Sequence, residues 1–200
     1  MAEAREDAPR RSRPKDRRET ILYVAMELFR KKGFAKTGID EIGAAAGISG
    51  PGVYRHFATK DAILQEAMDR VGARLWHAGD EIAGMSAEDG LRHLIGLHVA
   101  AALDAGPWMA VWQREQRSLP DRYRSSAIGQ QRRHVDEWVR LLTQVRPELT
   151  DGAAARTAVY ATLAVIHYAP SIYGVELPSD TLRQYLGDVA YVVLMAPVPS

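Results

Sequence analysis

The stretch "KTGIDEIGAAAGISGPGVYRHFATKD", residues 36–61, holds two short helix signals on either side of a glycine turn. Thr37 is a favourable N-cap residue for the first helix, which is predicted to end at Gly47. Ser49 is a second N-cap residue, and Pro51 fits the first turn of the next helix because its missing N–H needs no partner there. Two short helices joined by a turn of about four residues predict a helix-turn-helix, whose second helix enters the DNA major groove.

Other glycine-rich sites do not fit this stretch. A Walker A loop requires the pattern G-x-x-x-x-G-K-[ST], which the sequence lacks. A nucleophile elbow requires glycine at position 51, where proline stands, and a dinucleotide-binding loop follows a strand, whereas a helix is predicted before Gly47. The sequence therefore predicts that Gly50 and Gly52 let the start of the recognition helix approach bases and phosphates closely.

The neighbouring residues complete a helical DNA-binding domain over residues 19–64. Apolar residues recur at helical spacing in its first part and predict an amphipathic helix that ends at Gly33. Val53 and Phe57 lie four residues apart, so both are expected to face the core. Tyr54 is then expected to lie on another face of the recognition helix.

The charge of the chain is unevenly distributed. Residues 1–60 contain 13 Lys and Arg against 8 Asp and Glu, a formal charge of +5, and residues 61–200 carry −4. The segment "PRRSRPKDRR" has no apolar periodicity, and residues 1–18 are predicted to be a disordered basic arm. A basic N-terminal segment indicates a polyanionic partner, although a solvated charged tail explains the same excess of positive charge. The arm either lies in a DNA minor groove or stays in solvent.

Residues 17–66 resemble the DNA-binding domain of the TetR/AcrR family of bacterial transcription regulators. The resemblance rests on the segments "ILYVAMELFRKKGF" and "KTGIDEIGAAAGISGPGVYRHFATKDAIL". The residues that fit the family pattern in the second segment are Gly47, Ile48, Ser49, Val53, Tyr54, His56, Phe57 and Lys60. This resemblance implies an all-α protein, in which a helix-turn-helix domain precedes a helical bundle that binds a small-molecule effector and forms a homodimer.

The resemblance also implies which residues bind DNA. Thr37 and Tyr54 would contact phosphates, and Lys60 would do so at the start of the fourth helix. His56 would either contact the DNA backbone or pack below Tyr54. The full set of expected DNA-binding residues is Thr37, Ser49, Gly50, Pro51, Gly52, Tyr54, Arg55, His56 and Lys60.

Position 50 departs from the family pattern. It often carries a basic or polar residue in such proteins, and here it is glycine. Base reading is therefore expected to fall on Thr37, Ser49, Tyr54 and Arg55, together with backbone contacts and DNA shape.

Residues 65–200 show helical periodicity and no strand pattern, and they are predicted to be the ligand-binding and dimerisation domain. One long helix is predicted over residues 60–84, and Ser86, with Asp89 three residues on, caps the next. Later helices are predicted over residues 121–144, over residues 152–168 and from Ser179.

The last two helices favour a dimer. The first of them is rich in alanine, and the second carries apolar residues at steps of three and four. This pair suits a four-helix contact between two subunits, although an intramolecular core explains the same pattern. Recognition of a palindromic operator requires two DNA-binding domains and therefore a dimer.

Aromatic residues and histidines gather in the middle of this domain. They are expected to line an apolar effector cavity with a few polar groups, although an ordinary aromatic core explains each residue equally well. The segment from Trp112 to Leu142 also resembles effector domains that sense acyl-CoA thioesters or related lipid catabolites. The candidate ligand-binding residues are Trp108, Trp112, His134, Trp138, Tyr160, His167 and Tyr168.

Together these features favour a cytoplasmic, ligand-responsive repressor. The sequence has no cysteine, no secretory signal and no apolar run of the roughly 18 residues that a membrane span needs. No H-E-x-x-H motif is present, and neither a metal nor a cofactor is expected. Two alternatives remain. One is an enzyme that uses Glu115 and Asp136 as acid–base groups, and the other is a sequence-tolerant DNA organiser without an effector.

Overall fold

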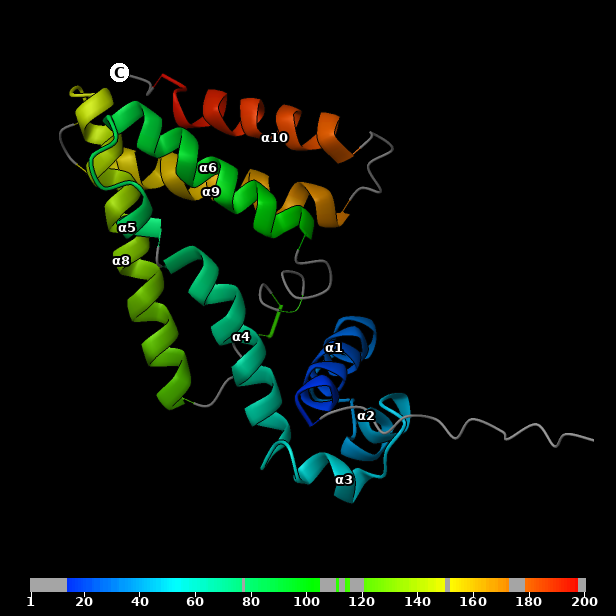
Figure 1. The fold of residues 1–200 in the computed structure, drawn as a ribbon. Helices are drawn as coiled ribbons and strands as arrows, with labels where there is room; N and C mark the ends of the chain where they lie inside the picture. Colours follow the sequence, from blue (N-terminus) through cyan, green and yellow to red (C-terminus); the bar gives the residue numbers. More distant parts are fainter. Residues whose placement is uncertain are drawn as a thin grey trace, which may run out of the picture. The chain divides into compact units, whose positions relative to one another are not determined.

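The computed structural model of the protein describes residues 14–76, 78–104, 111, 114–115, 121–149, 152–172 and 179–197. All regular secondary structure in these residues is helical, so the predicted all-α class is confirmed (Figure 1). None of the described helices is long and apolar enough to cross a membrane. The chain divides into two compact units, residues 1–63 and 64–200.

Glycines end the first two helices of the first unit. Gly33 follows the first helix with a φ of 88°, and Gly47 follows the second with a φ of 68°, so both predicted helix ends are confirmed. The helices of this part of the chain are α1 (Pro14–Lys32), α2 (Ile39–Ala45), α3 (Gly50–Tyr54) and the beginning of α4 (Lys60–Trp76).

A single apolar core holds these helices together. Val53 and Phe57 are buried in it, as predicted, and the rings of Phe29 and Phe34 meet edge to face with centroids 5.1 Å apart. The other buried apolar side chains of this core are Ile21, Leu22, Ala25, Met26, Ile42, Ala46 and Ile63.

Three predictions about element boundaries are wrong. The arm predicted over residues 1–18 is too long, because α1 begins at Pro14, whose fixed φ suits a first helical position. The helical residues predicted over 60–84 are described as α4 and α5 (Ala78–Glu81), and they end at Glu81, three residues before the predicted bound. Thr37 is not the N-cap of α2, since Gly38 takes that position without a side-chain cap.

The helices of the second unit pack around a larger apolar core. In Figure 1, α6, α9 and α10 run side by side and α8 crosses them near one end. The side chain of Trp138, from α8, is completely buried at the centre. The Ser86 hydroxyl caps α6, as predicted, by accepting the Asp89 N–H at 3.1 Å. The other helices described in this unit are α6 (Ala87–Asp104), α8 (Asp121–Val145), α9 (Ala153–Ile172) and α10 (Ser179–Leu194).

Candidate DNA-binding and ligand sites

The turn between α2 and α3 has the geometry of a helix-turn-helix. The Ser49 hydroxyl accepts the Gly52 N–H at 3.2 Å, and Pro51 occupies the first turn of α3, so the predicted cap is confirmed. Gly43 in α2 lies against the turn, where a Cβ atom would be 2.9–3.0 Å from backbone atoms of Ile48, Ser49 and Gly50. This close approach fixes α3 against α2 through backbone contact.

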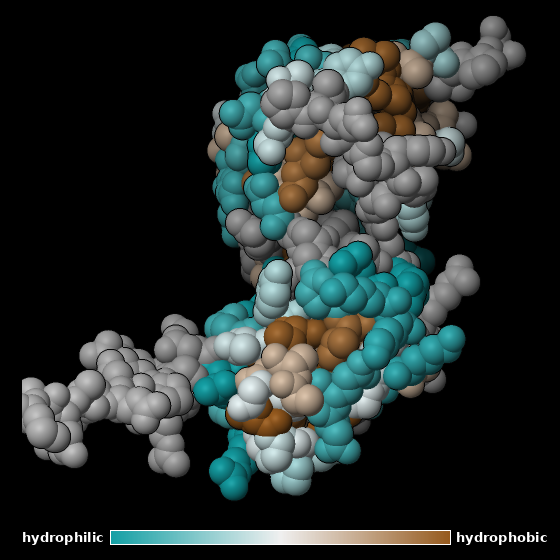
Figure 2. Space-filling view, turned by 90° about the vertical axis from the view of Figure 1, so that its right-hand side faces the viewer, coloured by the Kyte–Doolittle hydropathy of each residue, from teal (hydrophilic) through white to brown (hydrophobic). Residues whose placement is uncertain are grey.

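Most of the expected DNA-binding residues are accessible on one unit of the chain. Ser49, Pro51, Tyr54 and Arg55 are exposed, and Tyr54 keeps 55% of its surface in solvent. Gly52, His56 and Lys60 are half-buried, whereas Thr37 and Gly50 are buried. Figure 2 shows hydrophilic residues beside smaller hydrophobic patches on the face it presents.

Thr37 and Lys60 hold the turn between α1 and α2. The Thr37 hydroxyl donates to the Gly33 carbonyl at 2.9 Å. The Lys60 ammonium donates to the carbonyls of Phe34 and Thr37 at 2.8 and 2.9 Å, and it lies 4.4 Å from the centre of the Phe34 ring. Both polar groups therefore bind the backbone of this turn, which places α2 relative to α1.

Two arginines of α1 that no sequence pattern indicates bind the helix-turn-helix. The Arg17 guanidinium donates to the carbonyl of Ala46, the C-cap of α2, at 2.8 Å. The Arg18 guanidinium donates to the carbonyl of His56, just past α3, and lies 4.0 Å from the centre of the Phe57 ring. Cations at helix C-termini complement the helix dipole, so these arginines stabilise the ends of both helices.

Arg18→Ala is expected to weaken DNA binding about tenfold without changing its salt dependence. The variant releases the end of α3, whereas loss of a phosphate contact would also reduce the slope of log K against log salt by about 0.9. Affinity measured over a salt series distinguishes these two causes. Arg30→Ala removes an α1 arginine that pairs with Glu27 and serves as the control. A reduced slope for Arg18→Ala would mean that Arg18 binds a phosphate.

Three histidines meet in the core of the second unit. His98 of α6 is buried, and its Nδ1 lies 2.9 Å from His167 Nε2 on α9. The Nε2 atom of His98 lies 2.7 Å from His134 Nε2 on α8. His134 Nε2 also accepts the Trp138 indole N–H at 3.0 Å. Because the Trp138 indole N–H donates to His134 Nε2, this nitrogen carries no proton. The tautomers that fit the contacts have His98 donating from Nε2, where it shares the single lone pair of His134 Nε2 with Trp138, and accepting at Nδ1 from His167. The neutral rings thus form a directional chain across three helices.

Burial keeps this histidine chain neutral. It lowers the pKa of His134 and of His167 to about 4, and it lowers the pKa of His98 well below its usual value. The charge of one histidine further disfavours a charge on its neighbours. The rings form a chain through both nitrogens of His98 and do not converge on one point. No cluster that could hold a metal ion occurs among the residues described.

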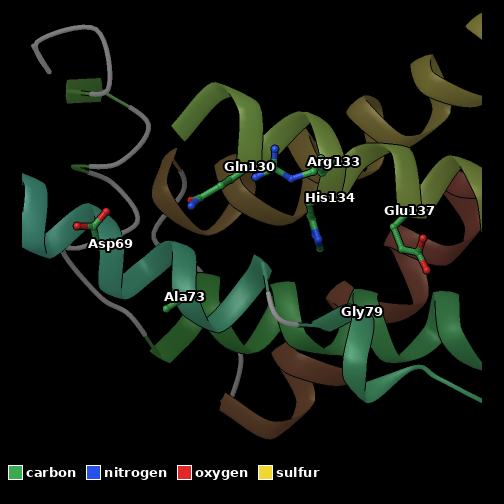
Figure 3. A pocket seen from close by; sticks show the side chains of 7 residues that line it. All are labelled: Asp69, Ala73, Gly79, Gln130, Arg133, His134 and Glu137. Carbon is green, nitrogen blue, oxygen red and sulfur yellow. The ribbon is translucent and has the colours of Figure 1, made fainter. Parts of the chain in front are cut away.

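A cavity of about 520 Å³ lies beside the histidine chain (Figure 3). His134 lies in its wall, so one end of the histidine chain reaches the cavity. Five of the seven described residues that line it carry charged or polar side chains, and of the predicted ligand residues His134 is among them. The lining residues are Asp69 and Ala73 of α4, Gly79 of α5, and Gln130, Arg133, His134 and Glu137 of α8.

The structure brings only some of the predicted ligand residues together. His134, Trp138 and His167 belong to one hydrogen-bonded cluster. Tyr160 and Tyr168 on α9 are each 47% exposed and are not part of the cavity wall. Trp108 and Trp112 lie outside the residues that the structure describes. His98 was not predicted, although its place on the apolar face of α6, four residues after Leu94, was a signal for it.

The two carboxylates considered for acid–base chemistry lie in separate ion pairs. Glu115 is buried and pairs with Arg114 at 3.1 Å. Asp136 is exposed on α8 and pairs with Arg156 of α9 at 2.7 Å. Neither belongs to the cavity wall described above.

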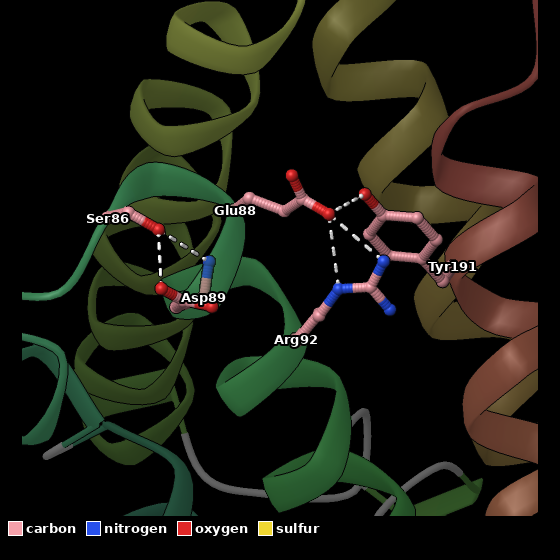
Figure 4. Close-up of polar contacts among 5 residues, drawn as sticks. All are labelled: Ser86, Glu88, Asp89, Arg92 and Tyr191. Atoms are coloured by element: carbon pink, nitrogen blue, oxygen red, sulfur yellow. Dashed lines mark hydrogen bonds and ion pairs between the residues drawn. The ribbon is translucent and has the colours of Figure 1, made fainter.

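Polar contacts attach α10 to α6 at the surface. Glu88 accepts hydrogen bonds from the Tyr191 hydroxyl at 2.9 Å and from Arg92 at 3.0 Å, and the Arg92 guanidinium lies 3.8 Å from the centre of the Tyr191 ring (Figure 4). The pKa of Glu88 is lowered, first by the Tyr191 hydrogen bond and then by Arg92. The other faces of α9 and α10 expose four large apolar or aromatic side chains, Tyr160, Tyr168, Tyr185 and Val192.

Comparison with known proteins agrees with this geometry. The sequence profile described as "Bacterial regulatory proteins, tetR family" matches residues 21–67. The chain is 30% identical over 196 residues to the HTH-type transcriptional repressor Rv3405c of Mycobacterium tuberculosis, covering 92% of this chain and 94% of that protein. Several other regulators that match carry the same helix-turn-helix designation.

Solved structures share the fold. A TetR-family transcriptional regulator from Bordetella parapertussis superposes with a TM-score of 0.77 at 19% identity, over 92% of this chain and 98% of that one. AibR, solved in complex with isovaleryl coenzyme A and operator DNA, superposes with a TM-score of 0.70 at 16% identity, over 86% and 97% of the two chains. The helix-turn-helix geometry, the relative aligned along nearly its whole length and the shared fold together place this chain in the TetR family of bacterial transcription regulators.

Proposed function

We propose that the protein is a homodimeric repressor that binds a palindromic operator through α3 and leaves it when a small effector binds the second unit. The two-sided character of the recognition helix carries this proposal. Val53 and Phe57 anchor one side in the core, while Ser49, Pro51 and Tyr54 stay accessible on the other. An accessible helix face of this kind, fixed by a capped N-terminus, suits insertion into a major groove.

The exposed faces of α9 and α10 support the dimer. Tyr160 and Tyr168 are two turns apart on α9, with Ala161 and Ala164 exposed between them. Tyr185 and Val192 are likewise exposed on α10. Small residues between aromatic ones allow a second pair of helices to approach closely, and pairing would cover this apolar surface.

The effector is proposed to bind the cavity that His134 borders. AibR, a protein with this fold, was solved in complex with isovaleryl coenzyme A, and KstR2 of Mycobacterium tuberculosis, which also has this fold, is a ketosteroid transcriptional regulator. A hydrophobic effector with a polar head, such as an acyl-CoA or a lipid catabolite, fits a wall that carries Gln130, Arg133 and His134. Release from DNA requires that this ligand bind the conformation that does not bind DNA more tightly than the one that does. The protein would act in the cytoplasm, where it meets both DNA and ligand.

Tyr54→Ala is expected to weaken DNA binding tenfold or more, because it removes a contact from the accessible face of α3. The fold and the dimer are expected to persist, since the side chain is 55% exposed. Fluorescence anisotropy with DNA retained by the wild type measures the affinity, and sedimentation measures the dimer.

Tyr23→Ala is a matched control for this test. Tyr23 is also 55% exposed, but it lies on α1. We expect this variant to bind DNA like the wild type. Equal affinities for wild type and Tyr54→Ala would show that α3 does not face the DNA as proposed.

A further inference from the structure

The leading end of the recognition helix has almost no side chains of its own to read bases. Its first three residues are Gly50, Pro51 and Gly52. None of them carries a side-chain hydrogen-bonding group. Ser49 precedes them, but its hydroxyl already accepts the Gly52 N–H as the helix cap.

A neighbouring carboxylate fills the space beside this end of the helix. A Cβ atom at Gly50 would lie 1.8 Å from Asp40 Oδ1 and 3.0 Å from Asp40 Cγ. The Asp40 carboxylate, from the first turn of α2, therefore occupies the place that a side chain at position 50 would take. Glycine at position 50 is what leaves room for it.

The carboxylate remains available for an outside partner. Asp40 is exposed, and it has no hydrogen bond or ion pair with the part of the chain that the structure describes. The adjacent Glu41 differs, because it pairs with Lys32. The fold thus presents one acceptor-only group beside the leading end of α3.

DNA offers this group one suitable kind of partner. Phosphates repel a carboxylate, and most acceptor atoms on base edges do so too. The major groove offers two amino donors, adenine N6 and cytosine N4. Adenine N6 lies beside the N7 acceptor, which repels a carboxylate, so cytosine N4 is the donor that Asp and Glu recognise. We propose that Asp40 determines specificity by accepting a hydrogen bond from cytosine N4 at one position in each half-site. This inference rests on the proposed function, since it requires α3 to enter the major groove.

Selection from random double-stranded DNA tests the proposal. The wild type is expected to prefer cytosine at one symmetric position of each half-site, and Asp40→Ala to lose that preference by about tenfold. Asp40→Asn is expected to shift the preference to adenine, whose N6 and N7 suit an amide. Asp61→Asn removes a carboxylate from the first turn of α4 and is expected to leave every position unchanged.

The Gly50→Ala variant provides an independent test of the same proposal. The new Cβ would displace the Asp40 carboxylate, so this variant is expected to change the preference at the same position as Asp40→Ala. In the double variant no carboxylate remains to displace, so it should match Asp40→Ala alone. Additive changes at different positions would contradict this coupling.

Two failures are distinguishable. If the wild type and Asp40→Ala select the same bases at every position, or if Asp40→Ala gains affinity equally on all sequences, the inference is overturned while the proposed function stands. If the wild type retains no motif, the proposed function is overturned, and the inference falls with it.

Discussion

Acidification from about pH 7.5 to about pH 5 is expected to lower the free energy of unfolding of residues 64–200 by about 4 kcal/mol. The histidine chain of His98, His134 and His167 is the cause. Burial lowers the pKa of His134 and of His167 from 6.5 to about 4. The nearby Glu137 carboxylate favours a charged His134, but burial outweighs it.

The direction of the effect follows from proton binding. Unfolded histidines take up protons below about pH 6.5, whereas the folded ones stay neutral down to about pH 4. The unfolded state therefore binds more protons in this window, and stability that is complete above about pH 6.5 is lost as the pH falls. At about pH 5 the loss is about 2 kcal/mol for each of the two histidines. His98 adds in the same direction, because its pKa is lowered further.

Urea unfolding monitored by tryptophan fluorescence measures this loss in the second unit, since Trp76, Trp108, Trp112 and Trp138 all lie in residues 64–200. A variant with both His134→Gln and His167→Gln is expected to lose much less stability over the same pH range. His93→Gln is the control, because His93 does not belong to the histidine chain and pairs with Glu81 at the surface. A wild type equally stable at both pH values would show that the buried chain does not form.

Gly43→Ala is expected to weaken DNA binding at least tenfold and to destabilise the helix-turn-helix by about 2 kcal/mol. The added Cβ would lie 2.9–3.0 Å from backbone atoms of Ile48, Ser49 and Gly50. Backbone at such a distance cannot rotate away as a side chain can, so the turn and α3 must move. The Ile48 N–H, which donates to the Gly43 carbonyl at 2.9 Å, would move with them.

Gly38→Ala is the matched control for this substitution. Gly38 stands at the other end of α2, and a Cβ there meets no atom within 4 Å. Its expected cost is confined to the N-cap. Amide hydrogen exchange over residues 39–57 measures local opening, and DNA affinity measures the consequence. Similar behaviour of the two variants would contradict the close contact at Gly43.

Local signals in the sequence predicted the fold well. Gly33 and Gly47 end helices, and Ser49 and Ser86 cap them, because each of these roles depends on only a few neighbouring residues. Thr37 is the exception among the caps. Its hydroxyl binds the carbonyl four residues earlier, which closes the turn after α1.

The functional residues that the sequence did not reveal depend on distant segments. The segment of Arg17 and Arg18 has no apolar period and so predicts a disordered arm, yet the two arginines bind partners 29 and 38 residues away. His98 acts through partners 36 and 69 residues away on two other helices. No periodicity encodes such contacts, since they exist only once the helices have packed.

Selection of the purified protein against random double-stranded DNA at near-physiological salt tests the central claim most directly. A dimeric TetR-family repressor is expected to retain a palindrome whose half-sites lie about one helical turn, or ~34 Å, apart. Retention of DNA without any motif, with a steep loss of binding as salt rises, would contradict that account and indicate a sequence-tolerant DNA organiser.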